Sequence, residues 1–319
     1  MLDPDDAELC LIALCATEGV GPVTVARLRR AAEGRGVPLE AMVALPADEL
    51  EAELGLTGPA ARLVAGIRDP LEAGRRVLAQ LGRLGVRVVQ AGAAEYPVRL
   101  GRFLGAQAPP VLFVAGDLSL LRRPCLAVVG SRRPSRGAAE AARFLAEDQA
   151  AAGTAIVSGG ARGIDTLAHG AAMVGGGTVV IPALGIARLH RHGPVGREPA
   201  EGRWCALGQF PPEASWRSAH ALMRNRTIVA LSGAVVAFEP RDCGGTWHSS
   251  ITALRMRKPL YVVTASRQGA KGRGLRRLVR MGAVALDPDR MPDAPALACL
   301  VADYRPPPCA GQLPLFDPP

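Results

Sequence analysis

The sequence predicts an α/β protein whose mostly parallel sheet carries helices on both faces, preceded by a small all-helical domain. After about residue 71, short and continuous apolar runs alternate with helical stretches. The first 70 residues show helical patterns without such runs, and glycine-rich turns follow several of the later runs. Continuous apolar strands that alternate with helices are typical of parallel sheets buried on both faces.

Residues 1–70 are predicted to form a helix–hairpin–helix arrangement. Short helices are expected over 9–17 and 23–32, with Gly19-Val20-Gly21-Pro22 between them, and Gly55-Leu56-Thr57-Gly58 precedes another over 59–67. An apolar residue between two glycines allows the chain to bend sharply between helices. This part carries 12 acidic and 6 basic side chains, a net charge of −6. The acidic surroundings favour a structural or partner-binding module over one that binds DNA phosphates.

Seven apolar runs predict the strands of a second domain at residues 71–290. They cover residues 86–89, 111–115, 126–129, 155–157, 178–181, 234–238 and 260–263. Helices are expected over 138–151 and 164–174. Ligands of such sheets collect at the carboxyl ends of the strands. Residues 291–319 are rich in proline and predict an extended tail.

One glycine-rich segment indicates a ligand more clearly than the rest of the chain. The run at 155–157 leads into Ser158-Gly159-Gly160-Ala161-Arg162-Gly163, and Asp165 follows at the start of a helix. Glycines let backbone N–H groups approach a ligand, a helix N-terminus adds partial positive charge, and Arg162 adds a full one. The segment predicts a phosphate site. Asp165 is expected to cap the helix and His169 to be a partly buried, hydrogen-bonded side chain.

Other segments combine positive charge with glycine or polar residues near predicted strand ends. Arginine binds phosphate through two parallel hydrogen bonds, and glycine permits a close approach. One such loop is common in α/β proteins, whereas several at one edge of the sheet would rarely occur by chance. The predicted phosphate-binding residues are Gly130, Ser131, Arg132, Gly159, Gly160, Arg162, Gly163, Arg224, Asn225, Arg226, Gly244, Gly245, Thr246, Arg267, Lys271 and Arg273.

Charge and cysteine content restrict the class of partner and the compartment. Residues 71–319 carry 32 basic and 17 acidic side chains, a net charge of +15, and no acid lies between Asp242 and Asp287. A field of one sign attracts polyanions. Seven scattered cysteines without metal-ligand spacing predict reduced thiols in the cytoplasm and no bound metal. No apolar run reaches the roughly 18 residues of a membrane span.

Several of these motifs occur together in one known family. The segments 128–132, 158–169 and 223–232 follow one another in the order seen in DprA/Smf DNA-processing proteins. Upstream, residues 95–100 and 109–116 resemble that family's entry into its Rossmann-like domain. The resemblance covers roughly residues 95 to 285, and the N-terminal hairpins suit the family's small SAM-like helical domain.

The resemblance implies a function in binding and no catalysis. A homodimer would bind and protect single-stranded DNA and hand it to a RecA-type recombinase, as in natural transformation. No catalytic residue and no cofactor is implied. The family's DNA pocket would correspond to Ser131, Arg132, Gly160, Arg162, Arg224, Arg226 and the turn Gly244-Gly245-Thr246.

The chain also departs from the family's pattern in several loops. Leu207-Gly208-Gln209-Phe210-Pro211 replaces a segment that usually contains Ser-Glu-Phe-Pro, and Gly244-Gly245-Thr246 replaces a Ser-Gly-Ser-like turn. Loops with Arg267, Lys271 and Arg273 replace neutral ones. These changes add positive charge and remove a carboxylate. Phosphate binding is expected to persist, while the partner or the biological context can differ.

Two other classes of function compete with this interpretation. The Gly244-Gly245-Thr246 turn is similar to one in nucleotide-hydrolysing enzymes, yet no carboxylate follows it before Asp287. The second alternative is an adaptor that acts through the acidic hairpins and the tail. The tail residues Gln312, Leu313, Leu315 and Phe316 resemble a pentapeptide that docks on the sliding clamp. A dinucleotide oxidoreductase is weaker, because no Gly-x-Gly-x-x-Gly opens the first βαβ unit.

Overall fold

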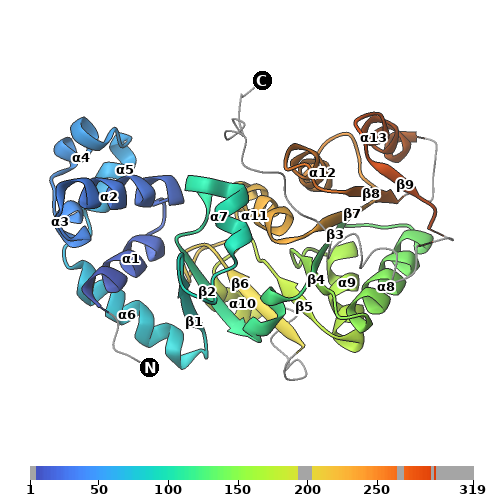
Figure 1. The fold of residues 1–319 in the computed structure, drawn as a ribbon, viewed down its shortest axis with the longest axis horizontal. Coiled ribbons are helices and arrows are strands. Elements are labelled where there is room, and N and C mark those ends of the chain that lie inside the picture. Colours follow the sequence, from blue (N-terminus) through green and yellow to red (C-terminus); the bar gives the residue numbers. More distant parts are fainter. Residues whose placement is uncertain (1–4, 193–202, 264–268, 289–290, 292–319) are drawn as a thin grey trace.

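Six helices and then a nine-stranded sheet follow one another along the chain (Figure 1). The structure is a computed structural model that describes residues 5–192, 203–263, 269–288 and 291. The N-terminal helices are α1 (Asp6–Ala16), α2 (Pro22–Arg35), α3 (Leu39–Val43), α4 (Ala47–Leu54), α5 (Gly58–Ala65) and α6 (Pro70–Arg83). The helical N-terminal part expected from the sequence is therefore present.

The hairpin between α1 and α2 depends on its glycines. Gly19 has a φ of +94°, a left-handed conformation that favours glycine, and Gly21 precedes Pro22 at the start of α2. Proline at the first helical position lacks only an N–H group that the helix would leave unpaired. The turn therefore ends α1 and begins α2 within a few residues.

The helical part continues beyond the predicted boundary at residue 70. Helix α6 begins at Pro70 and packs on α1, where a Cβ at Gly74 would overlap the carbonyl oxygen of Leu9. The absence of a side chain at Gly74 lets the two helices approach closely. The first strand begins only after α6 ends at Arg83.

The sheet is mostly parallel, as predicted, with an antiparallel edge. Its strand order is β1-β2-β6-β5-β4-β3-β7-β8-β9. Strand β2 pairs antiparallel with β1 and with β6, and all other neighbours are parallel. The strands are β1 (Arg87–Gln90), β2 (Val111–Gly116), β3 (Cys125–Gly130), β4 (Ala155–Ser158), β5 (Thr178–Val180), β6 (Trp204–Gly208), β7 (Ala234–Phe238), β8 (Leu260–Val263) and β9 (Val284–Leu286).

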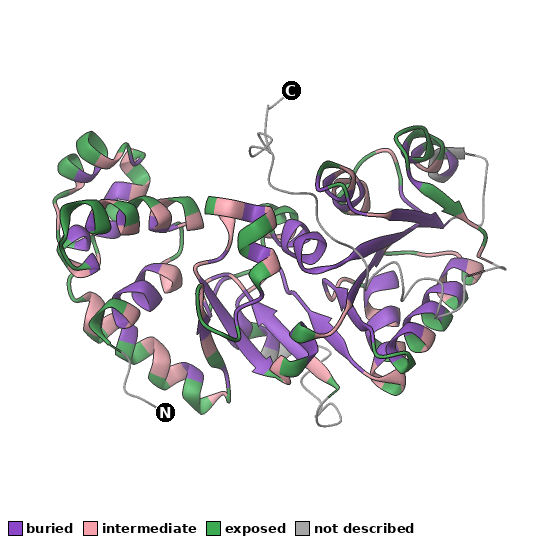
Figure 2. Cartoon of the chain, viewed as in Figure 1, coloured by how far each residue is buried: buried purple, intermediate pink, exposed green. Residues whose placement is uncertain are grey.

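Helices cover both faces of this sheet, which explains why its inner strands are buried, while the edge strands β1 and β9 are more exposed (Figure 2). On one face lie α7 (Val98–Leu104), α11 (Ser218–Leu231), α12 (Gly245–Arg255) and α13 (Gly269–Arg280). On the other face lie α8 (Arg136–Ala151) and α9 (Ile164–Gly175). The N-terminal helices and α10 (Ile186–His192) cover that second face where β2 and β6 pair. Short 3₁₀ helices at Gly105–Gln107 and Leu118–Arg122 complete the connections.

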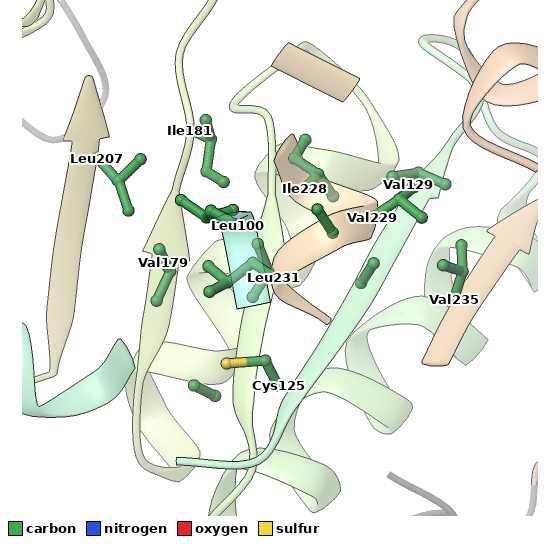
Figure 3. Packing of buried hydrophobic residues seen from close by; sticks show 14 of the residues in the cluster. Leu100, Cys125, Val129, Val179, Ile181, Leu207, Ile228, Val229, Leu231 and Val235 are labelled. Atoms are coloured by element: carbon green, nitrogen blue, oxygen red, sulfur yellow. The ribbon is translucent and has the colours of Figure 1, made fainter. Parts of the chain in front are cut away.

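Helix α11 is the most deeply buried helix of the first face. Its apolar residues Ile228, Val229 and Leu231 pack against the strands and against Leu100 of α7 (Figure 3). The same helix carries the Arg224-Asn225-Arg226 segment one turn earlier. The core therefore fixes the position of three predicted site residues.

A buried lysine holds the C-terminal end of α11. Lys258 Nζ donates hydrogen bonds to the carbonyl oxygens of Val229 (2.7 Å), Ala230 (2.8 Å) and Ser232. The Arg99 guanidinium donates to the carbonyl oxygen of Leu231 at 3.1 Å. Positive charge is favourable at a helix C-terminus, where carbonyl groups lack partners within the helix. Burial lowers the pKa of Lys258.

Replacing this lysine should destabilise the fold. In Lys258→Met the apolar part of the side chain remains, but several buried carbonyl groups lose a charged donor. We expect the free energy of unfolding to fall by about 3 kcal/mol, as for other buried hydrogen-bonded charges. Arg255→Met removes an exposed cation of the same segment and serves as the control in chemical denaturation. Equal stability of the two variants would contradict this role of Lys258.

Candidate functional site

Three loops meet at the carboxyl ends of adjacent parallel strands. Strand β3 lies between β4 and β7, so the loops that follow these strands share one edge of the sheet. The backbone N–H of Ser131 donates to the carbonyl oxygen of Phe238 at 3.2 Å, and that of Ile164 donates to the carbonyl oxygen of Ser131 at 3.1 Å. After β3 the chain forms β4, which pairs with one edge of β3. It later forms β7, which pairs with the opposite edge of β3. Ligands of open α/β sheets bind at such a reversal.

Two of the predicted ligand-binding glycines are required for packing between these loops. A Cβ at Gly130 would lie 2.6 Å from a side-chain carbon of Ile164. Gly163 has a φ of +92°, and a Cβ there would overlap the carbonyl oxygen of Ser131. The absence of side chains at both positions brings the β3 and β4 loops into direct contact.

Asp165 has a different local role from the predicted one. The residue that precedes α9 is Gly163, so Asp165 lies within the first helical turn and is not the cap. Its Oδ2 accepts hydrogen bonds from the backbone N–H groups of Gly159 (3.2 Å) and Ala161 (3.3 Å). The prediction was wrong because the carboxylate turns back to the glycine loop that precedes the helix. Burial raises the pKa of Asp165, and the Arg224 guanidinium acts in the opposite direction.

Arg224 lies beneath the glycine loop. Its side chain is buried, and its Nη1 lies 3.8 Å from Asp165 Oδ2. A Cβ at Gly159 would overlap the Arg224 guanidinium, so only glycine leaves room for this arrangement. Burial lowers the pKa of Arg224. The structure thus shows Arg224 supporting the loop, and a direct contact between Arg224 and a ligand stays a prediction.

The next two residues of α11 connect it to other parts of the site. Asn225 Nδ2 donates to the carbonyl oxygen of Gly245 at 3.3 Å and so links α11 to the start of α12. Arg226 is 9% exposed and lines a cavity of about 100 Å³ together with Gln209 and Met223. The three consecutive polar residues of α11 therefore lie at three different places: the glycine loop, the start of α12 and the small cavity.

Exposed positive charge at this edge comes from the two packed loops. Arg132 in the β3 loop and Arg162 in the β4 loop are both exposed to solvent. The exposed Gly244 has a φ of +89° and precedes α12, whose first N–H groups carry partial positive charge. Thr246 lies in the first turn of the same helix. These groups can bind an anion without the burial that restrains Arg224.

The structure describes only part of the remaining predicted basic residues. Arg273 on α13 is exposed, with its Nε 3.9 Å from a carboxylate oxygen of Asp242. Arg267 and the side chain of Lys271 lie outside the described residues, as do Gln312, Leu313, Leu315 and Phe316. A link between the α13 segment and the phosphate site stays a prediction.

His169 is buried and has a partner of its own. Its Nδ1 lies 2.7 Å from Oγ1 of Thr178, and that hydroxyl donates to the carbonyl oxygen of Ile156 at 2.8 Å. Because the hydroxyl gives its only hydrogen to Ile156, it is placed to accept a hydrogen bond from Nδ1–H of the ring. Burial lowers the pKa of His169 to about 3, and the Arg224 charge adds to this effect. The expected hydrogen-bonded role of His169 is confirmed.

Two further contacts of the site join residues that are distant along the chain. Glu239, directly after β7, has a φ of +49° and accepts a hydrogen bond from the Ser135 N–H at the start of α8. Trp247 is covered by Arg277, whose guanidinium carbon lies 4.9 Å from the ring centroid. Nothing in a single sequence identifies either pairing, because the partners are distant along the chain.

Metal-binding clusters and membrane-spanning helices are both absent from the described residues. No group of three or more His, Cys, Asp or Glu side chains in this part of the chain could hold a metal ion. Within the same residues, no helix has the length and apolar character needed to cross a bilayer.

The fold and the site define a Rossmann-like protein whose sheet edge carries exposed arginines and packed glycine loops. Comparison with known proteins gives the family. The model of the family described as DNA recombination-mediator protein A matches residues 87–292. The chain belongs to this DprA/Smf family.

Several relatives of known sequence share this similarity. DprA of Bacillus subtilis is 28% identical over 214 residues, which cover 66% of this chain and 71% of that protein. Protein Smf of Escherichia coli is 30% identical over 200 residues, covering 62% of this chain and 53% of that protein. A putative DprA of Mycobacterium tuberculosis is 29% identical over 306 residues, covering 88% of this chain and 69% of that protein.

Two solved structures have the same fold. DprA from Streptococcus pneumoniae has a TM-score of 0.67 and 22% identity, covering 95% of this chain and 99% of the other. DNA processing protein A from Helicobacter pylori has a TM-score of 0.57 and 24% identity, covering 69% of this chain and 97% of the other. The Helicobacter pylori structure concerns the mode in which that protein binds single-stranded DNA.

The low pKa of His169 predicts a loss of stability in mild acid. The unfolded chain takes up a proton near the ordinary histidine pKa of about 6.5, whereas the folded chain takes it up only near 3. The contribution to folding is therefore complete above pH 6.5 and decreases as the pH falls toward 3. At pH 5 the loss amounts to about 2 kcal/mol.

Urea denaturation at pH 7 and pH 5 would measure this loss, with His169→Gln as the comparison. The variant cannot titrate at this position, so its free energy of unfolding should decrease by less between the two pH values. An equal decrease for both proteins would show that His169 is not the titrating group.

Proposed function

We propose that the chain binds single-stranded DNA at the edge formed by the β3 and β4 loops and the start of α12. The observation that supports this most directly is the pair of exposed arginines, Arg132 and Arg162, on loops that pack against each other. Glycines at the packed positions bring the two loops together, and arginine binds phosphate well. Family membership and the single-stranded DNA binding of the Helicobacter pylori relative support DNA as the anion.

The proposed partners follow from the family. A homodimer in the cytoplasm would protect single-stranded DNA and load a RecA-type recombinase during transformation or another recombination process. The acidic surface of the N-terminal helices is available for a protein contact, since residues 1–70 have a net charge of −6. The chain would act by binding and not by catalysis, because no carboxylate follows the Gly244-Gly245-Thr246 turn before Asp287.

Affinity for an unstructured oligonucleotide should depend strongly on salt. Each phosphate contact contributes a logarithmic slope of about −0.7, so about four or five contacts give a slope near −3. Arg132→Ala and Arg162→Ala should each weaken all sequences alike and flatten the slope, because they contact phosphate and not base edges. Fluorescence anisotropy at several salt concentrations measures both quantities.

Arg143→Ala is the matched control for these variants. It removes an exposed arginine of α8, two turns from the site loops, and should leave the slope unchanged. Salt-independent binding, or an equal effect of all three substitutions, would contradict the proposed location. Hydrolysis of a nucleotide by the purified protein, lost in Thr246→Ala, would instead support the enzymatic alternative.

We also propose that the tail docks on the sliding clamp through Gln312, Leu313, Leu315 and Phe316. A proline-rich segment that carries leucine and phenylalanine suits insertion into an apolar pocket. Phe316→Ala should abolish co-elution with the purified clamp in gel filtration, whereas Asp317→Ala should preserve it. Unchanged co-elution of Phe316→Ala would reject this proposal without affecting DNA binding.

A further inference from the structure

Two adjoining cavities lie where the N-terminal helices meet the sheet domain, and we refer to them together as the seam groove. The larger has a volume of about 170 Å³ and the smaller about 100 Å³. Pro22, Gln209 and Met223 line both cavities, so the two lie side by side. One wall belongs to the α1–α2 hairpin and the opposite wall belongs to α11 and the segment after β6.

The walls of the larger cavity suit a flat ring. The hairpin turn Gly19-Val20-Gly21-Pro22 forms one side with apolar and backbone surface. Phe210 and His220 border the cavity as a stacked pair, with ring centroids 4.1 Å apart and an interplanar angle of 14°. An apolar cavity of roughly 150 Å³ holds a benzene ring. The seam groove therefore has room for one six-membered heterocycle.

The groove also contains a polar group that can recognise the edge of such a ring. Gln209 lines both cavities, and its buried Oε1 has no hydrogen-bond partner among the described residues. A side-chain amide offers both a donor and an acceptor, as do the edges of pyrimidine bases. The carboxylate of Glu18 at the rim is paired with Arg217 at 2.5 Å, which offsets its repulsion of a polyanion.

The smaller cavity shares helix α11 with the proposed phosphate site. Arg226 and Thr227 of α11 line it, and α11 also carries Arg224 beneath the β4 loop and Asn225 beside α12. Helix α11 thus contributes residues both to the seam groove and to the site. A strand held at the arginine loops would pass Arg226 before it reached the stacked rings.

We propose that the seam groove receives one pyrimidine base of the bound single-stranded DNA. The base would lie between the hairpin turn and Met223, next to the Phe210–His220 pair, with Gln209 at its polar edge. This inference depends on the proposed function, because it gives a second contact point to the same ligand. It assigns a role in DNA binding to the α1–α2 hairpin through its apolar turn.

The test uses a substitution that fills the groove without disturbing the core. Met223 is 39% exposed and its neighbour Leu222 is 44% exposed, but only Met223 lines the groove. Met223→Trp should weaken binding of oligothymidylate about fivefold, the loss expected when one stacked base worth about 1 kcal/mol is displaced. Leu222→Trp, the matched control, should bind like the unaltered protein.

An abasic oligonucleotide of equal length separates the base from the backbone. It carries the same charge, so the unaltered protein and Met223→Trp should bind it equally. In a second measurement, oligothymidylate that contains 4-thiothymidine is photocrosslinked to the unaltered protein. Crosslinked peptides should include Phe210 or Met223.

The outcomes distinguish this inference from the proposed function. Salt-dependent binding of oligothymidylate, with no effect of Met223→Trp and no crosslink in the groove, would overturn the inference and leave the proposed function intact. An equal loss for the abasic oligonucleotide would also overturn it, because the groove would then contact only backbone. If the unaltered protein bound neither oligonucleotide, both would fail.

Discussion

The arrangement of the site depends on one buried ion pair between Asp165 and Arg224. The carboxylate binds two N–H groups of the glycine loop, and the guanidinium lies against the same loop from helix α11. Removing one partner of a buried pair leaves an uncompensated charge and costs about 3–5 kcal/mol. The pair therefore couples the loop after β4 to α11 more firmly than an exposed ion pair could. The exposed Arg162 in that loop is therefore positioned by two buried residues.

Helix α11 transmits this constraint to the rest of the sheet edge. Lys258 and Arg99 bind its C-terminal carbonyl groups, and Asn225 binds the start of α12. Its apolar residues pack into the main core between the strands and α7 (Figure 3). A helix held at its end, along its side and at its polar turn has little freedom to move. These buried contacts hold the site loops in place, and such preorganisation would reduce the entropy lost when a ligand bound at the proposed site.

The apolar runs of the sequence predict much of the fold. The sequence predicts less of the arrangement of the site. All seven predicted strands are present, five of them as buried parallel strands, which are continuously apolar, whereas β6 and β9 were missed. Strand β9 is short and largely exposed, so its three residues give no such signal. In the site, Arg224 and Arg162 look equivalent in the sequence, but one is buried against Asp165 and the other is exposed. Only the packing of distant segments decides which arginine supports the loop and which faces solvent.

The apolar core between the N-terminal helices and the sheet has a consequence for how the molecule folds. Val111 and Phe113 of β2 pack in the same cluster as Leu14 of α1 and Leu28 of α2. Neither part could separate from the other without exposing these side chains to water, at a cost of roughly 1.5–3 kcal/mol for each fully buried residue. The stability of the helices is therefore coupled to that of the sheet through this shared core. An insertion or truncation at this junction would affect the stability of both.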